Sequence, residues 1–584
     1  MTDKWQKTKV IVAAAGIALL GACRDEEADT VHTQDPTTSR TIGQGELIGF
    51  RTGNGGPAWL GVPYAAPPVG DLRWRAPRSP AAWTGVMEAV VQPDWCPQIT
   101  NQLDEFYGIT QGELRGNEDC LYLNIYAPSG TPPPEGWPVM VWLHGGANIW
   151  GRASQYDGSI LAEEQDLVVV IPQYRIGPLG ALSTPALRES PQDPHDVSPN
   201  FGLLDAVAAL EWVEDNIGVF GGDTARVTLF GESSGAIATL GLHVSPLTQT
   251  LFQGAIAQSG VPISISVDRA ENGGSGTKNP SSQVIDSWFP ENPAHDGDDL
   301  RTLPLDTIFD AYRPNDEVNF SVPSMIEDGI VIPDAGVFET LASPNGFDNR
   351  PLMIGSNRDE AKLFFGFDEE FTGSLAGIPF IRDRQFYDTF TSALSRTWRV
   401  TGVVEPTEQL IDDAFDGLYT YQFDWDEEGY YLIVDVSRLL GATHIIEVPF
   451  VFGTFDNFFG DASAMIYHAR NEARRLELSA QMMSYWAQFA YTGAPGRGRN
   501  GNLPLWQSAA SVLGPETMIL DTSWDGGLRM SADDDSLEDI MSDLSGSGAI
   551  NAEEKCRTAM EMNQVFGLAA PELAAFAQQL CSNT

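Results

Sequence analysis

Positive charge is scarce along this chain of 584 residues. Lysine and arginine together number 34, against 80 aspartates and glutamates, and the formal net charge is -46. After residue 9 the lysines are Lys278, Lys362 and Lys555. Such a surface repels phosphate backbones and anionic headgroups, which excludes nucleic acid as a partner. Adaptation to a salty habitat and simple solubility explain the acidic balance equally well.

Repeats and long apolar runs are also missing. No self-similarity with a period of about 20 to 50 residues is visible, which excludes solenoids and propellers. A basic start leads into an apolar run over residues 10–22 that is too short to span a bilayer comfortably. The pattern of residues 1–22 is instead typical of a signal peptide.

Cys23 ends this segment in the sequence LGAC, which resembles the lipobox of bacterial lipoproteins. By that resemblance Cys23 is an acylated N-terminus, and the polar residues 23–43 form a flexible tether. The chain would then be exported to the periplasm or cell surface and would meet a membrane only through its lipid. Plain secretion, with Cys23 kept as a free thiol, is the alternative.

Only four further cysteines follow. An even number in an exported chain predicts two disulfides, most economically Cys96–Cys120 and Cys556–Cys581, each closing a loop of about 25 residues. Zinc ligands are the rival interpretation, but no pair of these cysteines has their close spacing. We therefore expect no metal site.

Strand and helix patterns alternate through the middle of the chain. Apolar runs without a period predict buried strands, and apolar positions three or four apart predict helices. The predicted strands are residues 139–143, 166–175, 225–231, 350–356 and 444–453, and the predicted helices are residues 201–222, 233–245 and 464–490. This order predicts an α/β fold with a mostly parallel sheet covered on both faces. Residues 268–300 are typical of a less regular surface excursion, and the segment between the last two strands suits a lid.

Residues 231–235 read GESSG, a Gly-x-Ser-x-Gly pattern centred on Ser233. The pattern alone is weak, because a chain of this composition contains it about 0.4 times by chance. Here, however, the predicted strand RVTLF precedes it and the predicted helix SSGAIATL follows it. A serine in that sharp turn exposes its oxygen above the sheet, and the flanking glycines allow close packing.

A serine hydroxyl becomes a nucleophile only with a base, a group that orients the base, and donors for the developing oxyanion. The start of the following helix offers the backbone N–H of Ser234. The turn HGGAN offers those of Gly146 and Ala147, although a glycine turn that merely links two elements is the alternative.

Four histidines follow Ser233 and are candidates for the base. His243 falls within the next helix, His295 lies in the irregular excursion, and His468 falls in a long helix whose solvated face explains it. His444 precedes the strand stretch VPFVFG in a loop, from which a base can reach over a sheet edge. For the acid, Asp359 and Glu360 both follow the strand 350–356, and position does not separate them.

Longer stretches resemble the type B carboxylesterases, the branch of the α/β-hydrolases that includes the cholinesterases. FGGDTARVTLFGESSG matches the serine signature of that family, and EDCLYLNIYAP matches its second signature. Further matches are GVPYAAPPVGDLRW, NFGLLDAVAALEWV, AIAQSG and GATHIIEVPFVFG, so the likeness covers about residues 44–510. It implies an α/β-hydrolase catalytic domain with a helical lid over residues 44–530, followed by an acidic C-terminal extension over residues 531–584.

The same resemblance assigns roles to single residues. It implies a serine esterase that needs no cofactor, with Ser233 as nucleophile, Glu360 as acid and His444 as base. The remaining assignments are the oxyanion donors Gly146, Ala147 and Ser234, the buried serine near the triad, Ser259, and the family's first disulfide, Cys96–Cys120. The expected partner is a small-molecule carboxylic ester, and the oligomeric state stays open.

The chain departs from the cholinesterases where they bind choline. Their stacking tryptophan falls near Thr110, where this chain has none, and Leu363 and Phe364 follow Glu360 where cholinesterases have aromatic gorge residues. We therefore expect uncharged esters, with Glu232 as the remaining group able to hold a cation. The alternatives are a catalytically inactive binding protein and a specialised hydrolase of a polyester, toxin or carbamate.

Overall fold

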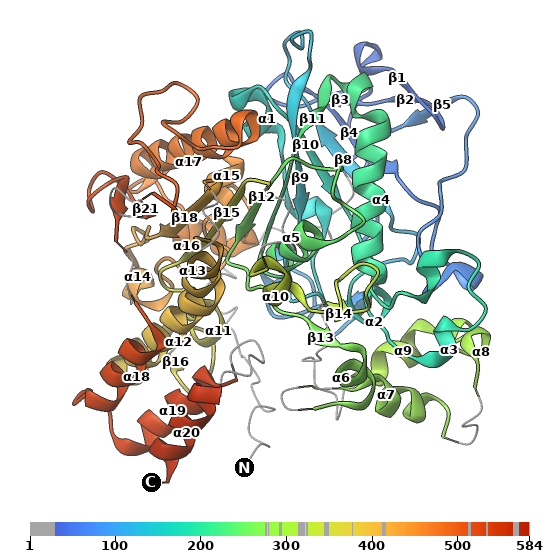
Figure 1. Cartoon of the computed structure of the whole chain (residues 1–584). Coiled ribbons are helices and arrows are strands. Elements are labelled where there is room, and N and C mark those ends of the chain that lie inside the picture. The colour runs from blue at the N-terminus through green and yellow to red at the C-terminus, as the bar shows by residue number, and fades with distance from the viewer. Residues whose placement is uncertain are drawn as a thin grey trace.

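A central sheet of eleven strands organises the molecule (Figure 1). The structure is a computed structural model that describes residues 30–582, except 275–276, 278, 291–294, 313–321, 323–324, 344–349, 376–377, 412–415, 512–515, 533–534 and 565–570. Cys23 and the predicted signal peptide lie outside the described residues.

The strands of this sheet are parallel from β21 to β10 and antiparallel at its two margins. In spatial order they are β22 (Arg529–Ser531), β21 (Thr517–Leu520), β18 (Leu418–Phe423), β15 (Leu352–Asn357), β12 (Gly254–Gln258), β11 (Gly222–Glu232), β9 (Trp137–Leu143), β10 (Val168–Pro172), β8 (Tyr122–Tyr126), β4 (Pro57–Pro63) and β3 (Phe50–Arg51). The predicted α/β architecture with a mostly parallel sheet is confirmed.

Alternate side chains of the central strands point to opposite faces, and each face has its own core. In β9, Val139, Val141 and Leu143 join the cluster beneath α4 (Phe201–Asn216) and α5 (Ser234–Val244). Met140 and Trp142 join the cluster that contains α1 (Ser159–Gln165), α15 (Val448–Phe452) and α17 (Glu472–Thr492). Both faces of these strands are buried, so their sequences are apolar throughout instead of alternating.

Shorter elements surround the sheet. The remaining strands are β1 (Arg40–Ile42), β2 (Gly45–Ile48), β5 (Val86–Glu88), β6 (Gln98–Ile99), β7 (Leu114–Arg115), β13 (Ile265–Ser266), β14 (Ile326–Glu327), β16 (Thr372–Leu375), β17 (Ile378–Ile381), β19 (Tyr430–Tyr431) and β20 (Val434–Asp435). The remaining helices up to the sheet's last strands are α2 (Gly177–Gly180), α3 (Pro185–Arg188), α6 (Val267–Asn272), α7 (Ser281–Trp288), α8 (Gly297–Arg301), α9 (Leu305–Asp310), α10 (Val337–Leu341), α11 (Lys362–Phe365), α12 (Arg384–Arg399), α13 (Glu405–Ile411), α14 (Val436–Leu439) and α16 (Ser463–Ile466). Of the predicted tether, residues 36–38 form a 3-10 turn and residues 40–42 form β1. The short helices α6, α7 and α8 lie in the described part of the segment predicted as irregular.

The predicted strand at 444–453 is wrong. His444 lies in a turn, and residues 448–452 form helix α15, while β18 takes the place beside β15 in the sheet. All five residues of α15 are buried, and an apolar run of that kind has no period that distinguishes a strand from a helix. Pro449 in the first turn and Gly453 in the left-handed conformation at the end were the available helix signals.

The predicted single helix over residues 464–490 is also wrong, because the chain turns between α16 and α17. Asn471 stabilises that turn: its side chain donates to the Ile466 carbonyl and accepts from the His468 backbone N–H. The His468 ring therefore does not lie on a solvated helix face, and its Nε2–H donates to the Glu428 carbonyl over 2.7 Å.

The C-terminal residues form three helices, α18 (Leu537–Gly546), α19 (Ala552–Met562) and α20 (Pro571–Cys581), which lie beside α12 in Figure 1. The Cys556–Cys581 disulfide joins α19 to α20, so this predicted pairing is confirmed. Of the helices that the structure describes, none combines the length and apolar character that a membrane crossing requires.

Candidate active site

Ser233 occupies a strained turn between β11 and α5. Its φ of 56° and ψ of -124° are rare for a residue with a side chain. The glycines on either side allow the close packing: a Cβ on Gly231 would lie 2.6 Å from the Gly235 backbone, and a Cβ on Gly235 would lie 2.1 Å from the Leu143 carbonyl oxygen. The predicted strand–turn–helix context of Ser233 is confirmed.

The turn after β9 lies against Ser233. A Cβ on Gly145 would stand 3.1 Å from the Ser233 Cβ, so the two turns are in direct contact. Gly146 and Ala147 both have positive φ, at 114° and 52°. Within the described residues, the N–H groups of Gly146, Ala147 and Ser234 donate no hydrogen bond to another backbone group or side chain. These three donors therefore remain available beside the serine.

His444 meets Glu360 in a fully buried contact. Nδ1 of His444 lies 2.6 Å from Glu360 Oε2, and the other carboxylate oxygen accepts the Asn357 N–H over 2.7 Å. The side chain of Glu360 is completely buried. Two other histidines that were candidates for the base lie elsewhere. The ring of His243 stacks on Phe252, and the ring of His295 stacks on Phe289.

Asp359 has a different set of partners from Glu360. Its carboxylate pairs with Lys362 over 3.0 Å and with Arg358 over 2.8 Å, and it accepts the Ala442 N–H. Burial opposes the ionisation of Asp359, but Lys362 and Arg358 outweigh it and hold its pKa below the usual value. The structure thus separates the two acids that position in the sequence left equivalent.

Glu232 approaches the second ring nitrogen of His444. Its Oε1 lies 3.0 Å from Nε2, yet that oxygen accepts no hydrogen bond from any residue that the structure describes. The contact therefore lacks hydrogen-bond alignment, and it is an ion pair only when His444 is protonated and Glu232 ionised. Burial lowers the pKa of His444, but Glu232 and Glu360 outweigh it and raise that pKa to about 9.

Glu447 is a third buried carboxyl group in this cluster, which the sequence analysis missed. Its oxygens accept hydrogen bonds from Asn357 Nδ2 over 2.6 Å and from Gln258 Nε2 over 3.3 Å. Burial and the nearby Glu360 raise the pKa of Glu447 to about 7. Burial also raises the pKa of Glu232, and Glu447 and Glu360 add to the rise. A negative charge on Glu447 therefore disfavours ionisation of Glu232.

An aromatic wall borders the same histidine. The ring centroid of Trp398 lies 4.7 Å from that of His444, and the ring of Phe364, which is half exposed, lies 5.4 Å away. Nε1–H of Trp398 donates to the Ser259 carbonyl over 3.2 Å. Ser259 is buried, and its hydroxyl has no hydrogen-bond partner among the described residues. Trp398 gave no sequence signal, because it lies in a helix far from every motif.

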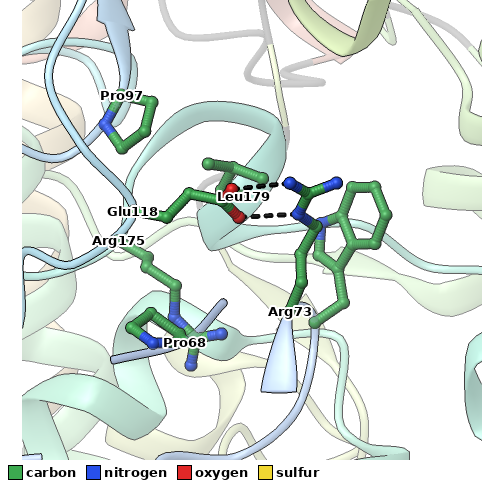
Figure 2. A pocket seen from close by; sticks show the side chains of 7 residues that line it. Pro68, Arg73, Pro97, Glu118, Arg175 and Leu179 are labelled. Carbon is green, nitrogen blue, oxygen red and sulfur yellow. Dashed lines mark hydrogen bonds and ion pairs between the residues drawn. The ribbon is translucent and has the colours of Figure 1, made fainter. Parts of the chain in front are cut away.

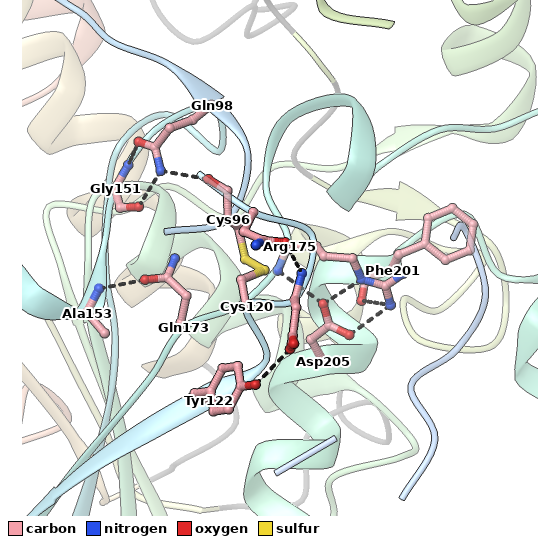
Figure 3. Close-up of a disulfide and its surroundings, with 12 residues drawn as sticks. Cys96, Gln98, Cys120, Tyr122, Gly151, Ala153, Gln173, Arg175, Phe201 and Asp205 are labelled. Atoms are coloured by element: carbon pink, nitrogen blue, oxygen red, sulfur yellow. Dashed lines mark hydrogen bonds and ion pairs between the residues drawn. A yellow bond between two sulfur atoms is a disulfide. The ribbon is translucent and has the colours of Figure 1, made fainter. Parts of the chain in front are cut away.

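The predicted Cys96–Cys120 disulfide is confirmed (Figure 3). Gln98, two residues after Cys96, exchanges two hydrogen bonds with the Gly151 backbone, at 2.9 and 3.0 Å. A Cβ on Gly151 would lie 2.4 Å from His144 Nδ1, so this segment packs directly on the glycine turn.

Glu118, in the stretch EDCLYLNIYAP, forms an ion pair with Arg73. Figure 2 shows its carboxylate paired with Arg73, through bonds of 2.6 and 2.5 Å. The cleft that these side chains line with Trp74 and Arg175 is too narrow for a water molecule. This cleft therefore offers no substrate site, and the candidate active site is the cluster around Ser233 and His444. In the described part of the chain, no three His, Cys, Asp or Glu side chains are placed to hold a metal ion.

A serine in this strand–turn–helix, above a sheet of this order, defines an α/β-hydrolase. The model of the carboxylesterase family matches residues 36–377. Para-nitrobenzyl esterase of Bacillus subtilis is 32% identical over 81% of this chain and 92% of its own, and human cocaine esterase is 32% identical over 86% and 90%. A solved structure of para-nitrobenzyl esterase superimposes with a TM-score of 0.63 at 28% identity, over 86% of this chain and 99% of its own. The chain belongs to the carboxylesterase family and is a carboxylic ester hydrolase.

Proposed function

We propose that Ser233, His444 and Glu360 are the nucleophile, base and acid of this hydrolase, acting through an acyl-enzyme. The observation that carries the proposal is the 2.6 Å contact between His444 and Glu360, in the same buried cluster as Glu232, the residue before Ser233. Glu360 accepts the Nδ1–H of His444 and so leaves Nε2 as the basic nitrogen.

In the first half of the reaction, Nε2 of His444 takes the Ser233 proton while Oγ attacks the ester carbonyl. The carbonyl oxygen becomes an oxyanion, which the N–H groups of Gly146, Ala147 and Ser234 would bind. His444 then returns the proton to the leaving alcohol. In the second half, water attacks the acyl-enzyme in the same way and releases the acid.

Labelling with an organophosphate tests this assignment. We expect one adduct on the peptide that holds GESSG and no ester hydrolysis by Ser233→Ala of normal thermal stability. An unlabelled Ser233 in folded protein, with hydrolysis intact in the variant, would contradict it.

We also propose that uncharged esters are preferred and that Cys23 carries a lipid after export. The place of the cholinesterase tryptophan falls near Thr110, where this chain has no tryptophan. Burial raises the pKa of Glu232, which weakens any attraction for a cation. The basic start, the apolar run and LGAC support the lipid. We expect Cys23→Ser to appear as soluble exported protein. A wild-type protein that is already soluble and has an unmodified mature N-terminus would contradict lipid attachment at Cys23.

A further inference from the structure

The C-terminal helices α18–α20 cover an apolar cluster that adjoins the proposed active site. On the catalytic side this cluster contains Ala361 and Phe365, which adjoin Glu360 and Phe364, and a row of α12 residues. The extension contributes the apolar side chains Leu537, Ile540, Leu544, Ile550, Ala559, Met562, Leu573, Phe576 and Ala577. The C-terminal extension therefore buries much of the apolar face of α12, although none of the proposed reacting groups lies in the extension.

Helix α12 connects the parts of the active site that come from different loops. Ser395 accepts the Ala361 N–H over 3.0 Å, next to Glu360. Tyr387 donates its hydroxyl to the Leu439 carbonyl over 2.7 Å, in the helix just before the His444 turn. Trp398 packs on the His444 ring and donates to Ser259. A displacement of α12 would therefore change the surroundings of both the acid and the base.

Ionic contacts join α12 to the extension at its exposed edge. Arg396 forms a two-bond contact with Asp535, both bonds 2.7 Å long, and a third bond of 2.9 Å with Asp543 of α18. Arg557 of α19 pairs with Glu370, which follows α11. Inside the extension, Lys555 donates to the Ser545 carbonyl and the Cys556–Cys581 disulfide joins α19 to α20. The extension is thus tied together internally and tied to α12 by both apolar and charged contacts.

From these contacts we infer that the extension is a clamp on α12 that sets the positions of Trp398 and Phe364 against His444. Trp398 and Phe364 are then specificity-determining residues, because their rings lie against His444 and so limit the space beside it in which an ester bound to Ser233 must react. The inference rests on the proposed function, in which Ser233 and His444 carry out the reaction. Loosening the clamp would broaden that space and alter the discrimination between small and bulky acyl groups.

The test compares acetate and benzoate esters of the same alcohol, in full-length protein. Ile540→Ala removes a fully buried side chain of α18, and Asp535→Asn with Asp543→Asn removes the carboxylates that hold Arg396. Glu538→Gln is the matched control, since Glu538 is exposed on α18 and forms no ion pair within the described residues. Active sites are counted with an organophosphate, so unfolded protein does not enter the rates.

We expect the ratio of kcat for benzoate to kcat for acetate to shift by about 2- to 30-fold in Ile540→Ala and in the same direction, by less, in the double variant. Glu538→Gln should keep the wild-type ratio. A ratio that stays constant in both variants while their melting temperatures fall would mean that the extension only stabilises the fold, and would overturn the clamp. If Ile540→Ala does not fold, the double variant decides alone. Wild type that neither hydrolyses an ester nor is labelled at Ser233 would overturn the proposed function and the clamp together.

Discussion

Glu360 and His444 are 84 residues apart in the sequence, and their side chains meet at 2.6 Å in a buried contact. Asp359, the neighbour of Glu360, faces Lys362 and Arg358 instead. We therefore predict that Glu360→Gln lowers kcat by about 10⁴, because the histidine can then adopt the wrong tautomer, as in the serine-protease triad. Asp359→Asn is the matched control and should lower kcat far less. Steady-state kinetics on both variants, with melting curves to check folding, decide the assignment; the reverse order of effects would make Asp359 the acid.

The pH dependence of activity should respond to Glu232. Neutral His444 is needed as a base, so kcat/KM rises with pH through the pKa of that histidine in the free enzyme. Glu232 and Glu360 raise this pKa to about 9 against the opposing effect of burial. Glu232→Gln removes one of the carboxyl groups that raise the pKa of His444, so we predict that the rising limb moves to lower pH. An unmoved limb, or a move to higher pH, would contradict the charge contact, and Glu477→Gln on the exposed face of α17 is the control.

The glycines beside Ser233 should not tolerate a methyl group. Gly235→Ala would place its Cβ 2.1 Å from the Leu143 carbonyl oxygen, and Gly231→Ala would place its Cβ 2.6 Å from the Gly235 backbone. We predict a loss of about 1 to 3 kcal/mol in the free energy of unfolding for each, together with loss of activity. Gly53→Ala is the control, since nothing lies within 4 Å of the added Cβ. Equal stability of all three variants in denaturant titrations would refute this account of the motif.

The two disulfides should each contribute about 3 kcal/mol to stability, because each closes a loop of about 25 residues in the unfolded chain. Replacing Cys96 and Cys120 with serine should also reduce activity, since Gln98 beside Cys96 supports the glycine turn through Gly151. Peptide mapping without reducing agent checks both pairings. Free thiols at these four positions in exported protein would contradict the prediction.

Choline esters should be poor substrates. We predict that kcat/KM for butyrylcholine falls well below that for an uncharged butyrate ester. The reason is that this chain has no tryptophan near Thr110, where the cholinesterases have the tryptophan that stacks on choline. Similar values for both esters would show that another group binds the cation. Glu232→Gln would then identify that group if it lowered kcat/KM for the choline ester alone.

Local features of this protein followed from its sequence because neighbouring residues determine them. The turn at Ser233 requires glycine on both sides where backbone atoms approach closely, and such a requirement is visible in five consecutive residues. The parallel strands are apolar runs of the length expected for buried strands. Because strand and helix patterns alternate along the chain, the sequence also predicted that the sheet is mostly parallel. The cysteine spacing predicted both disulfides for the same reason, since it offered one economical pairing.

Only the tertiary structure decided which side chains surround His444. Position in the sequence left Glu360 and Asp359 equivalent, because the direction in which each side chain leaves its loop is not encoded locally, and His444 lies 84 positions away from Glu360. Glu447 joins the cluster from the turn before a helix that was predicted as a strand, and Trp398 packs on the histidine from a helix without a motif. Their positions depend on packing across the whole core, because contacts between distant segments form only when the sheet and its helices are assembled.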